Sequence, residues 1–456
     1  MRTAGIIAEY NPFHTGHEYH IRKAKELTGA DFAIIVMSPD FVQRGEPAIF
    51  DKYTRAEMAL RCGADLVVEL PVCYAAGSAE YFAEGSVRLL EKLGVTDALC
   101  FGAEMTPEGE IAATGHGDET AKLSEVSSEG TSTLFRKTAQ LLLEEPDAYR
   151  EALQSGLRRG LTFPQARTEA IRAYLKEPRR CTDLLSSPNN LLGVEYCKAL
   201  QKIHSKIRPV PLARRGSRYS SDTLGGEFCS AGAIRSAIQK ESPDARIWNT
   251  ASCESPVSEP EDSLRRTLSP YIPESCSELF WKSCKAPVFA DSLLPILYQK
   301  LIMGDRFDEI LDISPDLSDR ICGLRDSCIG KSFEEIAALL KTRQITQARI
   351  RRALLHLVLD IRKDTVEAYR PGGSVFYAHV LGFRSDAAPL LHEIKKRSSL
   401  PFLTKASHAP KLLSGAGLRM WKQDVAASHL YRSLQTSRYG LTFRNEYKIS
   451  PKIISS

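Results

Sequence analysis

Residues 9–17 of this chain read EYNPFHTGH, and they directly follow the apolar run AGIIA at residues 4–8. The segment puts His14 and His17 on either side of Gly16. A glycine lets a bulky group approach the backbone closely, and the free N–H groups at the start of a helix bind anions. Imidazole N–H donors beside such a turn could reach the same anion. We therefore expect a phosphate-binding loop between a strand and a helix.

The first hundred residues around this segment alternate between short apolar runs and amphipathic stretches. Continuous apolar strands that alternate with helices predict a parallel sheet covered on both faces. In such a sheet ligands bind beyond the carboxyl ends of the strands, which is where EYNPFHTGH lies. The predicted strands are residues 3–9, 31–38, 65–71 and 97–104, and the predicted helices are 16–27, 54–63 and 78–94.

Two polar segments interrupt the pattern: residues 106–130 predict a loop, and residues 250–262 an acidic linker rich in Ser and Pro. We expect an α/β domain over residues 1–240, with a loop and helical insertion at 106–185, and a mainly helical domain over 241–456. Almost everything after the linker reads as helical until about the last thirty residues. Between the two polar segments, the pattern predicts helices at 133–178 and 230–240, a loop that caps a helix at 186–202, and a strand at 207–215.

The composition is that of an ordinary globular protein, with 43% hydrophobic and 26% charged residues. No run approaches the roughly twenty apolar residues of a transmembrane helix, and the N-terminal apolar run is too short for a signal peptide. The cysteines include no Cys-x-x-Cys pair. Scattered cysteines without such a pair favour reduced thiols in a cytoplasmic protein and argue against a zinc site. Because no apolar run is long enough, we also expect no membrane segment.

Positive charge is concentrated in the C-terminal third of the chain. From Lys331 to Ser456 there are 22 Lys and Arg against 9 Asp and Glu, a net charge of +13, whereas the whole chain carries +5. Such segregation indicates a polyanion-binding face, and the alternative is a solvated helical surface with no partner. Within this third, Arg349, Arg352 and His356 would share one face of a helix and could follow a line of phosphates.

Several segments together resemble one family. EYNPFHTGH is similar to the phosphate-binding signature of the HxGH nucleotidyltransferase superfamily. The segments of the chain follow one another as in the tRNA(Met) cytidine acetate ligase family, and the resemblance is densest over residues 5–104. The segments that carry it are GIIAEYNPFHTGHEYHI, MSPDFVQRGEPAIFDKYTRAEMAL, ADLVVELPVCYAAGSAEYFAEGSVRLL, FGAE, SSPNNLLGVEY, SAGAIRSAI and VLGF.

The resemblance implies a Rossmann-like nucleotidyltransferase core and a two-step ligase reaction. ATP would activate acetate as acetyl-adenylate, and the acetyl group would pass to the N4 amine of the wobble cytidine of elongator tRNA(Met). The products would be N4-acetylcytidine, AMP and pyrophosphate. Mg²⁺ can accompany ATP as a substrate, but no carboxylate pair in the sequence indicates a dedicated metal site.

The resemblance also carries functional residues onto this sequence. It implies that His14 and His17 stabilise charge on the phosphates. It implies ATP contacts at Ile7, Ala8, Glu9, Tyr10, Asn11, Pro12, Phe13, His14, Thr15, Gly16, His17, Glu18, Tyr19, His20 and Gly102, at Asn189 or Asn190, and at Arg214 or Arg215. Gly102 could instead be a turn glycine and Asn189 a helix N-cap, and the pleat of the strand will select one arginine.

Two segments depart from the superfamily pattern. SAGAIR keeps Ser230 and Arg235 for the leaving pyrophosphate but has Gly232 where a hydroxyl is usual, so only its backbone N–H could donate. MSPD has Pro39 and Asp40 where a glycine-led turn is expected, which puts the substrate contacts of that loop in doubt.

For the RNA, the basic C-terminal third would supply the phosphate contacts. The candidate tRNA-binding residues are Arg349, Arg351, Arg352, Lys395, Lys396 and Arg397. Two other functions remain open at this point. One is a nucleotidyltransferase that adenylylates a small phosphorylated metabolite, and the other is an RNA-binding module with a structural nucleotide site.

Overall fold

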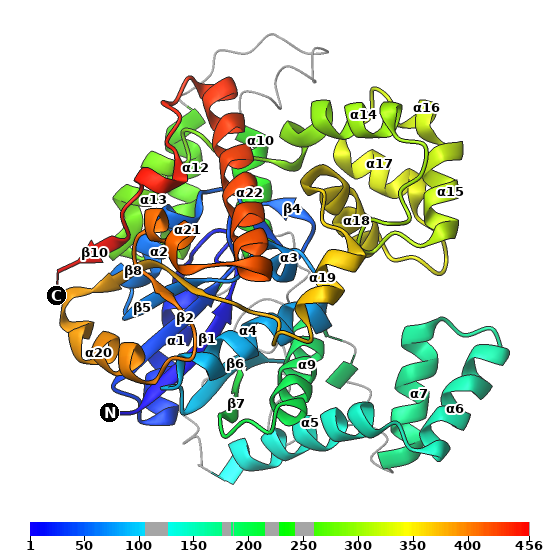
Figure 1. Ribbon diagram of the computed structural model, residues 1–456, viewed down its shortest axis with the longest axis horizontal. Helices are drawn as coiled ribbons and strands as arrows, with labels where there is room; N and C mark the ends of the chain where they lie inside the picture. The colour runs from blue at the N-terminus through cyan, green and yellow to red at the C-terminus, as the bar shows by residue number, and fades with distance from the viewer. Residues whose placement is uncertain (105–125, 176–183, 186, 215–227, 242–259, 456) are drawn as a thin grey trace.

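The computed structural model describes residues 1–104, 126–175, 184–185, 187–214, 228–241 and 260–455. Its centre is a twisted sheet in which five strands run parallel in the order β5-β2-β1-β6-β7 (Figure 1). The predicted α/β fold class is therefore confirmed. These strands are β1 (Thr3–Ala8), β2 (Phe32–Met37), β5 (Leu66–Glu69), β6 (Ala98–Ala103) and β7 (Arg208–Ala213).

The strand order reverses at β1, the first strand of the chain. β2 lies on one side of β1 and β6 on the other, so that Ile6 is the partner of both Ile35 and Cys100. The connections therefore run to opposite sides from this point, and such a switch point opens a crevice beyond the carboxyl ends of the central strands. EYNPFHTGH begins at this crevice, directly after β1.

The far edge of the sheet differs from the prediction. β8 (Ala378–Arg384) pairs antiparallel with β5, and β10 (Lys452–Ile454) and β9 (Phe402–Leu403) both pair with β8. The sheet is thus mixed, and it draws strands from both sides of the boundary that we expected at residue 240. The run AHVLGFR, which forms β8, is mostly buried in the sheet. Its pairing partner β5 lies about 300 residues earlier in the chain, so the local pattern did not indicate this strand.

Helices cover both faces of the sheet, as its apolar strands require. One core contains Ile21 of α1, Tyr53 of α2 and Ile234 of α10, and the other contains Val87 of α4 and Val194 of α9. The helices of the first face are α1 (Thr15–Thr28), α2 (Lys52–Arg61), α10 (Ala231–Glu241), α12 (Pro260–Leu268) and α13 (Ser277–Ser283). Those of the second are α4 (Ala79–Leu93), α5 (Val126–Glu144) and α9 (Pro188–Lys202).

The expected insertion is helical in its described part. It consists of α5, α6 (Asp147–Arg158) and α7 (Phe163–Leu175), and α6 and α7 project away from the sheet (Figure 1). Most of the predicted loop at 106–130 lies outside the described residues. A short hairpin of β3 (Phe41–Val42) and β4 (Glu46–Pro47), and the single turn α3 (Val72–Ala75), are elements that the sequence pattern did not predict.

The C-terminal third is mainly helical, as predicted, apart from β8, β9 and β10. The long helix α22 (Gly415–Tyr439) continues well into the last thirty residues, where we expected helix to end. The remaining α-helices between α13 and α22 are α14 (Leu294–Met303), α15 (Pro315–Gly323), α16 (Arg325–Cys328), α17 (Phe333–Leu340), α18 (Gln347–Leu359), α19 (Lys363–Tyr369), α20 (Ala388–Arg397) and α21 (Ala409–Leu412). Among the described residues, no helix has both the length and the apolar composition of a membrane span.

Buried charges attach this third to the sheet. Lys52 Nζ lies 2.7 Å from carboxylate oxygens of both Glu69 and Glu446, and all three side chains are 1% exposed. His379 Nδ1 lies 2.5 Å from Glu69. Glu69, His379 and Glu446 are close enough to hold a cation, and the ammonium of Lys52 already supplies the positive charge between the two carboxylates. The cluster is therefore an ion-pair network that joins α2, β5, β8 and the C-terminal segment.

Candidate active site

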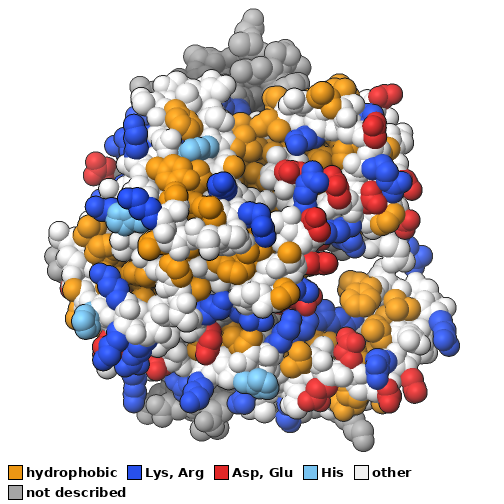
Figure 2. Space-filling view, viewed as in Figure 1, with side chains coloured by type: hydrophobic (Ala, Val, Ile, Leu, Met, Phe, Trp, Pro, Cys, Tyr) orange, Lys and Arg blue, Asp and Glu red, His pale blue; other side chains and the backbone are white. Residues whose placement is uncertain are grey.

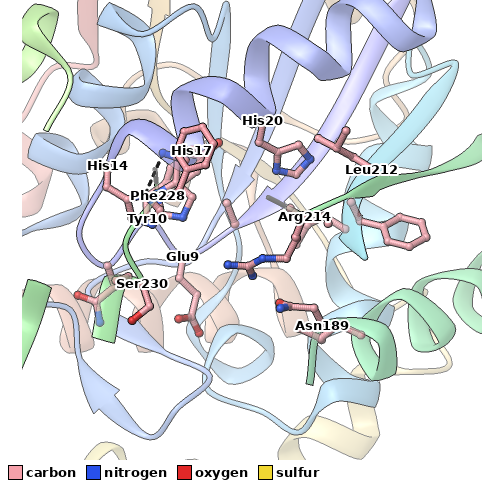
Figure 3. A pocket seen from close by; sticks show the side chains of 18 of the residues that line it. Glu9, Tyr10, His14, His17, His20, Asn189, Leu212, Arg214, Phe228 and Ser230 are labelled. Carbon is pink, nitrogen blue, oxygen red and sulfur yellow. Dashed lines mark hydrogen bonds between the residues drawn. The ribbon is translucent and has the colours of Figure 1, made fainter. Parts of the chain in front are cut away.

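A cavity of about 200 Å³ opens at the switch point, beyond the ends of β1, β6 and β7 (Figure 3). Figure 3 shows the histidines of α1 on one side of it, with the Arg214 side chain between them and Asn189. Fifteen of the residues assigned to ATP or phosphate from the sequence line this cavity. They are Ile7, Ala8, Glu9, Tyr10, Asn11, His14, Gly16, His17, Tyr19, His20, Gly102, Asn189, Arg214, Ser230 and Arg235.

The loop between β1 and α1 is held in one conformation by its own side chains. Tyr10 is fully buried with a positive φ of 51°, which turns the chain out of the strand. His14 is the N-cap of α1, and its Nδ1 accepts a hydrogen bond from the Gly16 N–H at 3.1 Å. Because Nδ1 is the acceptor, the proton of the neutral His14 ring is on Nε2. His14 therefore offers one N–H donor to a ligand.

The three histidines of this helix remain neutral near pH 7. Burial and the nearby charge of Arg214 lower the pKa of His14 to about 3 and that of His20 to about 4. The pKa of His17 is well below its usual value, because of burial and the neighbouring His14 and Arg214. Neutral imidazoles keep N–H donors without adding mutually repelling charges, which suits a site that binds a highly charged phosphate chain.

Hydrogen bonding around the loop is incomplete among the described residues. Tyr10 Oη, Asn11 Nδ2, Thr15 Oγ1, His17 Nδ1 and His20 Nε2 are buried there without a partner. Buried polar groups without partners cost free energy, and native structures satisfy nearly all of them. The loop therefore has polar groups that a bound ligand or water can complete.

Asn189 and Asn190, which the sequence could not separate, have different positions. Asn190 is buried, and its Oδ1 accepts from the Glu104 N–H at 2.8 Å. Asn189 lines the cavity, and its Nδ2 donates to Glu104 Oε1 at 2.7 Å. The helix N-cap is neither of them, because the Ser187 side chain accepts from the Asn190 N–H. Asn189 is thus the residue that a ligand can contact.

Arg214 follows the end of β7 and lies against Gly102 of β6. A Cβ atom on Gly102 would stand 3.2 Å from Arg214 Cγ and 3.4 Å from its Cδ. The absence of a side chain at Gly102 therefore makes room for Arg214 to cross the cavity. Arg215, the alternative arginine, lies outside the described residues.

Ser230 and Arg235 close the other side of the cavity. Ser230 Oγ accepts from the Ala233 N–H at 3.0 Å, in the first turn of α10. Arg235 donates to the backbone carbonyl of Asn11 at 2.6 Å and pairs with Glu46 at 3.1 Å. Arg235 thus supports the histidine loop as well as lining the cavity. Gly232 is in the same first turn.

Among the described residues of the predicted ATP set, five do not line the cavity: Pro12, Phe13, Thr15, Glu18 and Asn190. Phe13, for example, is fully buried and packs edge-on against Tyr10 with ring centroids 4.8 Å apart. The remaining lining residues were not predicted. They are Gln43, Arg44, Phe82, Phe101, Leu192, Tyr196, Leu212, Ala213, Phe228, Cys229 and Ala231.

Gln43 and Arg44 come from the hairpin of β3 and β4, in the segment whose departure from the superfamily pattern put its substrate contacts in doubt. The structure brings it to the cavity, and the basic Arg44 directly before Gly45 was the available signal. Glu9 is the one carboxylate among the described lining residues, and its Oε1 accepts from the Gln43 N–H at 2.9 Å. Burial raises the pKa of Glu9. A Mg²⁺ ion bound with ATP phosphates commonly takes one or two protein carboxylates, and Glu9 would have to be ionised, against this shift, to serve as one.

The arginines predicted to track RNA phosphates on α18 are engaged by the protein itself. Arg352 pairs with Asp312 at 2.9 Å, and Arg349 donates to the Asp312 carbonyl at 3.2 Å. His356 is fully buried between the carbonyls of Leu311 and Ala76. The prediction of an exposed face through these three positions is therefore wrong, because this face of α18 packs against the segment around Asp312. Arg351 pairs with Glu334.

Lys395, Lys396 and Arg397 are exposed at the C-terminal end of α20. The backbone of Arg397 packs against Gly94, which follows α4 at the edge where the parallel strands begin. That edge is opposite the cavity. Figure 2 shows Lys and Arg side chains spread over this view of the molecule rather than gathered on α18 alone.

Comparison with known proteins agrees with this geometry. The model of the HIGH Nucleotidyl Transferase family matches residues 1–126 and 120–444. The tRNA(Met) cytidine acetate ligase of Thermoanaerobacter sp. (strain X514) is 38% identical over 94% of this chain and 95% of its own length. That of Clostridium novyi (strain NT) is 34% identical over 99% of both.

Among solved structures, Thermotoga maritima TmcAL bound with alpha-thio ATP has 29% sequence identity and a TM-score of 0.81 over 100% of both chains. The apo structure of the same protein has 30% identity and a TM-score of 0.83, also over 100% of both chains. Sequence similarity of this degree extends over almost the full length of the curated relatives. The chain belongs to the tRNA(Met) cytidine acetate ligase family.

Proposed function

We propose that this protein is an ATP-dependent ligase that activates acetate as acetyl-adenylate and acetylates the N4 amine of the wobble cytidine of elongator tRNA(Met). The observation that supports it most directly is the cavity at the switch point, where His14, His17 and Arg214 converge beside a helix N-terminus. Donors of this kind, fixed before the substrate binds, are what phosphate-transfer sites use to stabilise charge. The family names supply the acceptor, tRNA(Met).

In the first step a carboxylate oxygen of acetate attacks the α-phosphate of ATP, and the bond to the β-phosphate breaks to release pyrophosphate. Acetate is already ionised at neutral pH, so this step needs no enzyme nucleophile. His14 and His17 would donate from neutral imidazoles to phosphate oxygens, and Arg214 would supply the positive charge. Mg²⁺, where bound, would contribute charge neutralisation on the phosphates, with Glu9 as its protein ligand.

In the second step the cytidine amine attacks the acetyl carbonyl carbon, and AMP leaves. The exocyclic amine is reachable only when the base is unpaired, as in an anticodon loop. We also infer that the protein acts in the cytoplasm, an inference supported by relatives that are named as ligases of tRNA(Met). Contacts to the RNA backbone would come from the basic C-terminal third. Lys395, Lys396 and Arg397 are exposed there, although Arg397 pairs with Glu393 at 2.8 Å. Arg349, Arg351 and Arg352 are partly buried and have acidic or carbonyl partners.

The test is transfer of labelled acetate to RNA in the presence of ATP. The acceptors are transcripts of elongator tRNA(Met), initiator tRNA(Met) and elongator tRNA(Met) with uridine in place of the wobble cytidine. We expect label in the first transcript alone, with AMP and pyrophosphate as co-products. Label in a small phosphorylated metabolite would instead support the metabolite nucleotidyltransferase, and absence of label with retained tRNA binding would support an RNA-binding module.

A further inference from the structure

Arg55 of α2 is fully buried, and its guanidinium is directed entirely at backbone carbonyls. Its Nη1 donates to the carbonyl of Glu9 at 2.5 Å and to that of Ser38 at 3.1 Å. Its Nη2 donates to the carbonyl of Pro39, and its Nε donates to that of Phe50 at 2.9 Å. Arg55 is thus a single side chain that holds four backbone positions.

Two of these contacts hold the strand ends that border the cavity. Glu9 follows β1 and lines the cavity, and Ser38 follows β2. The Ser38 N–H also donates to the Ala8 carbonyl at 3.0 Å. Arg55 therefore adds a second link between the two strand ends, beside the one that the backbone makes. The distance between the end of β1 and the end of β2 is therefore set in part by Arg55.

The Glu9 carbonyl is also the start of the histidine loop. Tyr10, the next residue, turns the chain with its positive φ, and the carbonyl of Asn11 after it is held by Arg235. Two arginines from different helices thus hold the carbonyls on either side of Tyr10. The direction in which the chain leaves this turn determines where His14 and His17 stand.

A guanidinium is a costly way to fill a core if packing alone is required. Burial lowers the pKa of Arg55, opposed mainly by the charge of Asp40. The two carboxylate oxygens of Asp40 already accept from the Lys52 N–H at 2.7 Å and from Ser428 Oγ at 2.8 Å. Apolar residues of similar volume often replace buried charges without loss of stability. A lysine could not substitute either, because one ammonium lacks the planar fork that reaches carbonyls in several directions.

We propose that Arg55 is a positioning residue for the adenylation step, holding the carbonyls of Glu9, Ser38 and Pro39 so that His14 and His17 meet the phosphates of ATP. This inference rests on the proposed function, and it adds a residue that does not line the cavity. A displacement of about 1 Å in a catalytic group can cost on the order of 10²-fold in rate. The transfer of acetyl from a ready-made adenylate to tRNA releases no pyrophosphate, so it should depend less on the loop.

The test measures the two steps separately in Arg55→Lys. Step one is followed as acetate-dependent exchange of pyrophosphate into ATP, and step two as acetylation of tRNA(Met) from supplied acetyl-adenylate. Per folded protein, we expect the kcat of step one to fall about 10–100-fold, while the KM for acetate and the rate of step two stay within about threefold. Arg61→Lys is the matched control, because Arg61 is on the same helix and, within the described part of the chain, its side chain bonds only Glu57.

Equal losses in both steps, or no loss in either, would overturn the positioning role and leave Arg55 a core residue. Should Arg55→Lys yield too little folded protein, Arg55→Gln removes the buried charge and keeps one donor group, and the same unequal loss is expected from it. Failure of the proposed function itself would be seen in the wild-type protein, which would then catalyse neither step.

Discussion

The imidazole rings of His14 and His17 lie with their centroids 3.8 Å apart and their planes inclined by 34°. Two protonated rings at this separation would repel each other, and the low pKa of both removes that repulsion. Each ring is also fixed from another side, His14 by its bond from the Gly16 N–H and His17 by its edge contact with Tyr10 at 4.8 Å. The pair is thus a set of neutral donors that is in place before a phosphate arrives.

Replacing His17 with Ala should lower the rate of acetyl-adenylate formation by roughly 10²–10³-fold, the usual cost of removing one preorganised donor. Folding should be almost unchanged. His14→Ala should cause a similar loss of rate and, because His14 is a buried N-cap, also lower the free energy of unfolding by about 1 kcal/mol. Pyrophosphate exchange and denaturant titration measure these effects, with His392→Ala on exposed α20 as the control. Near-normal exchange by the His17 variant would exclude the proposed role.

The pH dependence of stability should reveal the neutral histidines. His20 has a pKa of about 4 when folded and about 6.5 when unfolded, so unfolding takes up a proton between these values. Its contribution to stability is complete above pH 6.5 and is lost as pH falls through 4. Other groups act in the opposite direction, since burial raises the pKa of Asp424 to about 8. The effect of His20 is therefore best seen as a difference between variants.

Between pH 7 and pH 5, the free energy of unfolding should fall in both proteins, and by up to about 2 kcal/mol less in His20→Asn than in the wild type. Urea titrations at the two pH values measure this. A non-hydrolysable ATP analogue should reduce the difference, because phosphate charge favours the protonated ring. Parallel pH profiles for wild type and His20→Asn would mean that the pKa of His20 is not lowered in the folded protein.

The close approach of Arg214 to Gly102 predicts a graded effect of side chains at this position. Gly102→Ala would press on the flexible Arg214 chain at 3.2 Å and should change the KM for ATP little. Gly102→Val should displace Arg214 and raise that KM on the order of 10-fold, the cost of about 1.4 kcal/mol in binding. Gly323→Ala is a suitable control because, among the described residues, nothing outside its chain neighbours and its own helix backbone lies within 4 Å of the added Cβ. Equal effects of Ala and Val would argue against displacement of Arg214.

How far the sequence predicts this molecule depends on the range of the interaction involved. The strand, loop and helix around EYNPFHTGH follow from local pattern, and the structure has them within one or two residues of the predicted bounds. Asn189 and Asn190 could not be separated, because Glu104, which bonds both, lies some 85 residues earlier. The burial of His356 and the pairing of Arg352 on α18 could not be foreseen for the same reason, since Leu311 and Asp312, which bond them, lie outside the helix whose periodicity was used.

Arg352 should therefore act on stability rather than on RNA binding. Arg352→Glu would place a second carboxylate against Asp312, where both side chains are about 15% exposed. Breaking a buried pair costs on the order of 3–5 kcal/mol, and partial exposure should bring this towards the lower figure. Thermal unfolding and tRNA affinity, measured on the same samples, separate the two roles. A variant of normal stability with weakened tRNA binding would restore Arg352 to the RNA surface.

Salt should distinguish the two substrates without any mutation. If Lys and Arg side chains hold the RNA by its phosphates, the logarithm of tRNA affinity should fall linearly with that of salt concentration, with a slope of about 0.7–0.9 per phosphate neutralised. ATP affinity should fall much less, because its phosphates would meet a buried loop and a helix N-terminus where screening is weaker. Lys395→Glu combined with Lys396→Glu tests whether α20 contributes: a reduced slope would place the RNA across the edge opposite the cavity. An unchanged slope with strong salt dependence would assign the phosphate contacts to other basic residues. A tRNA affinity that hardly varies with salt would show that the basic residues of the C-terminal third form only a solvated surface.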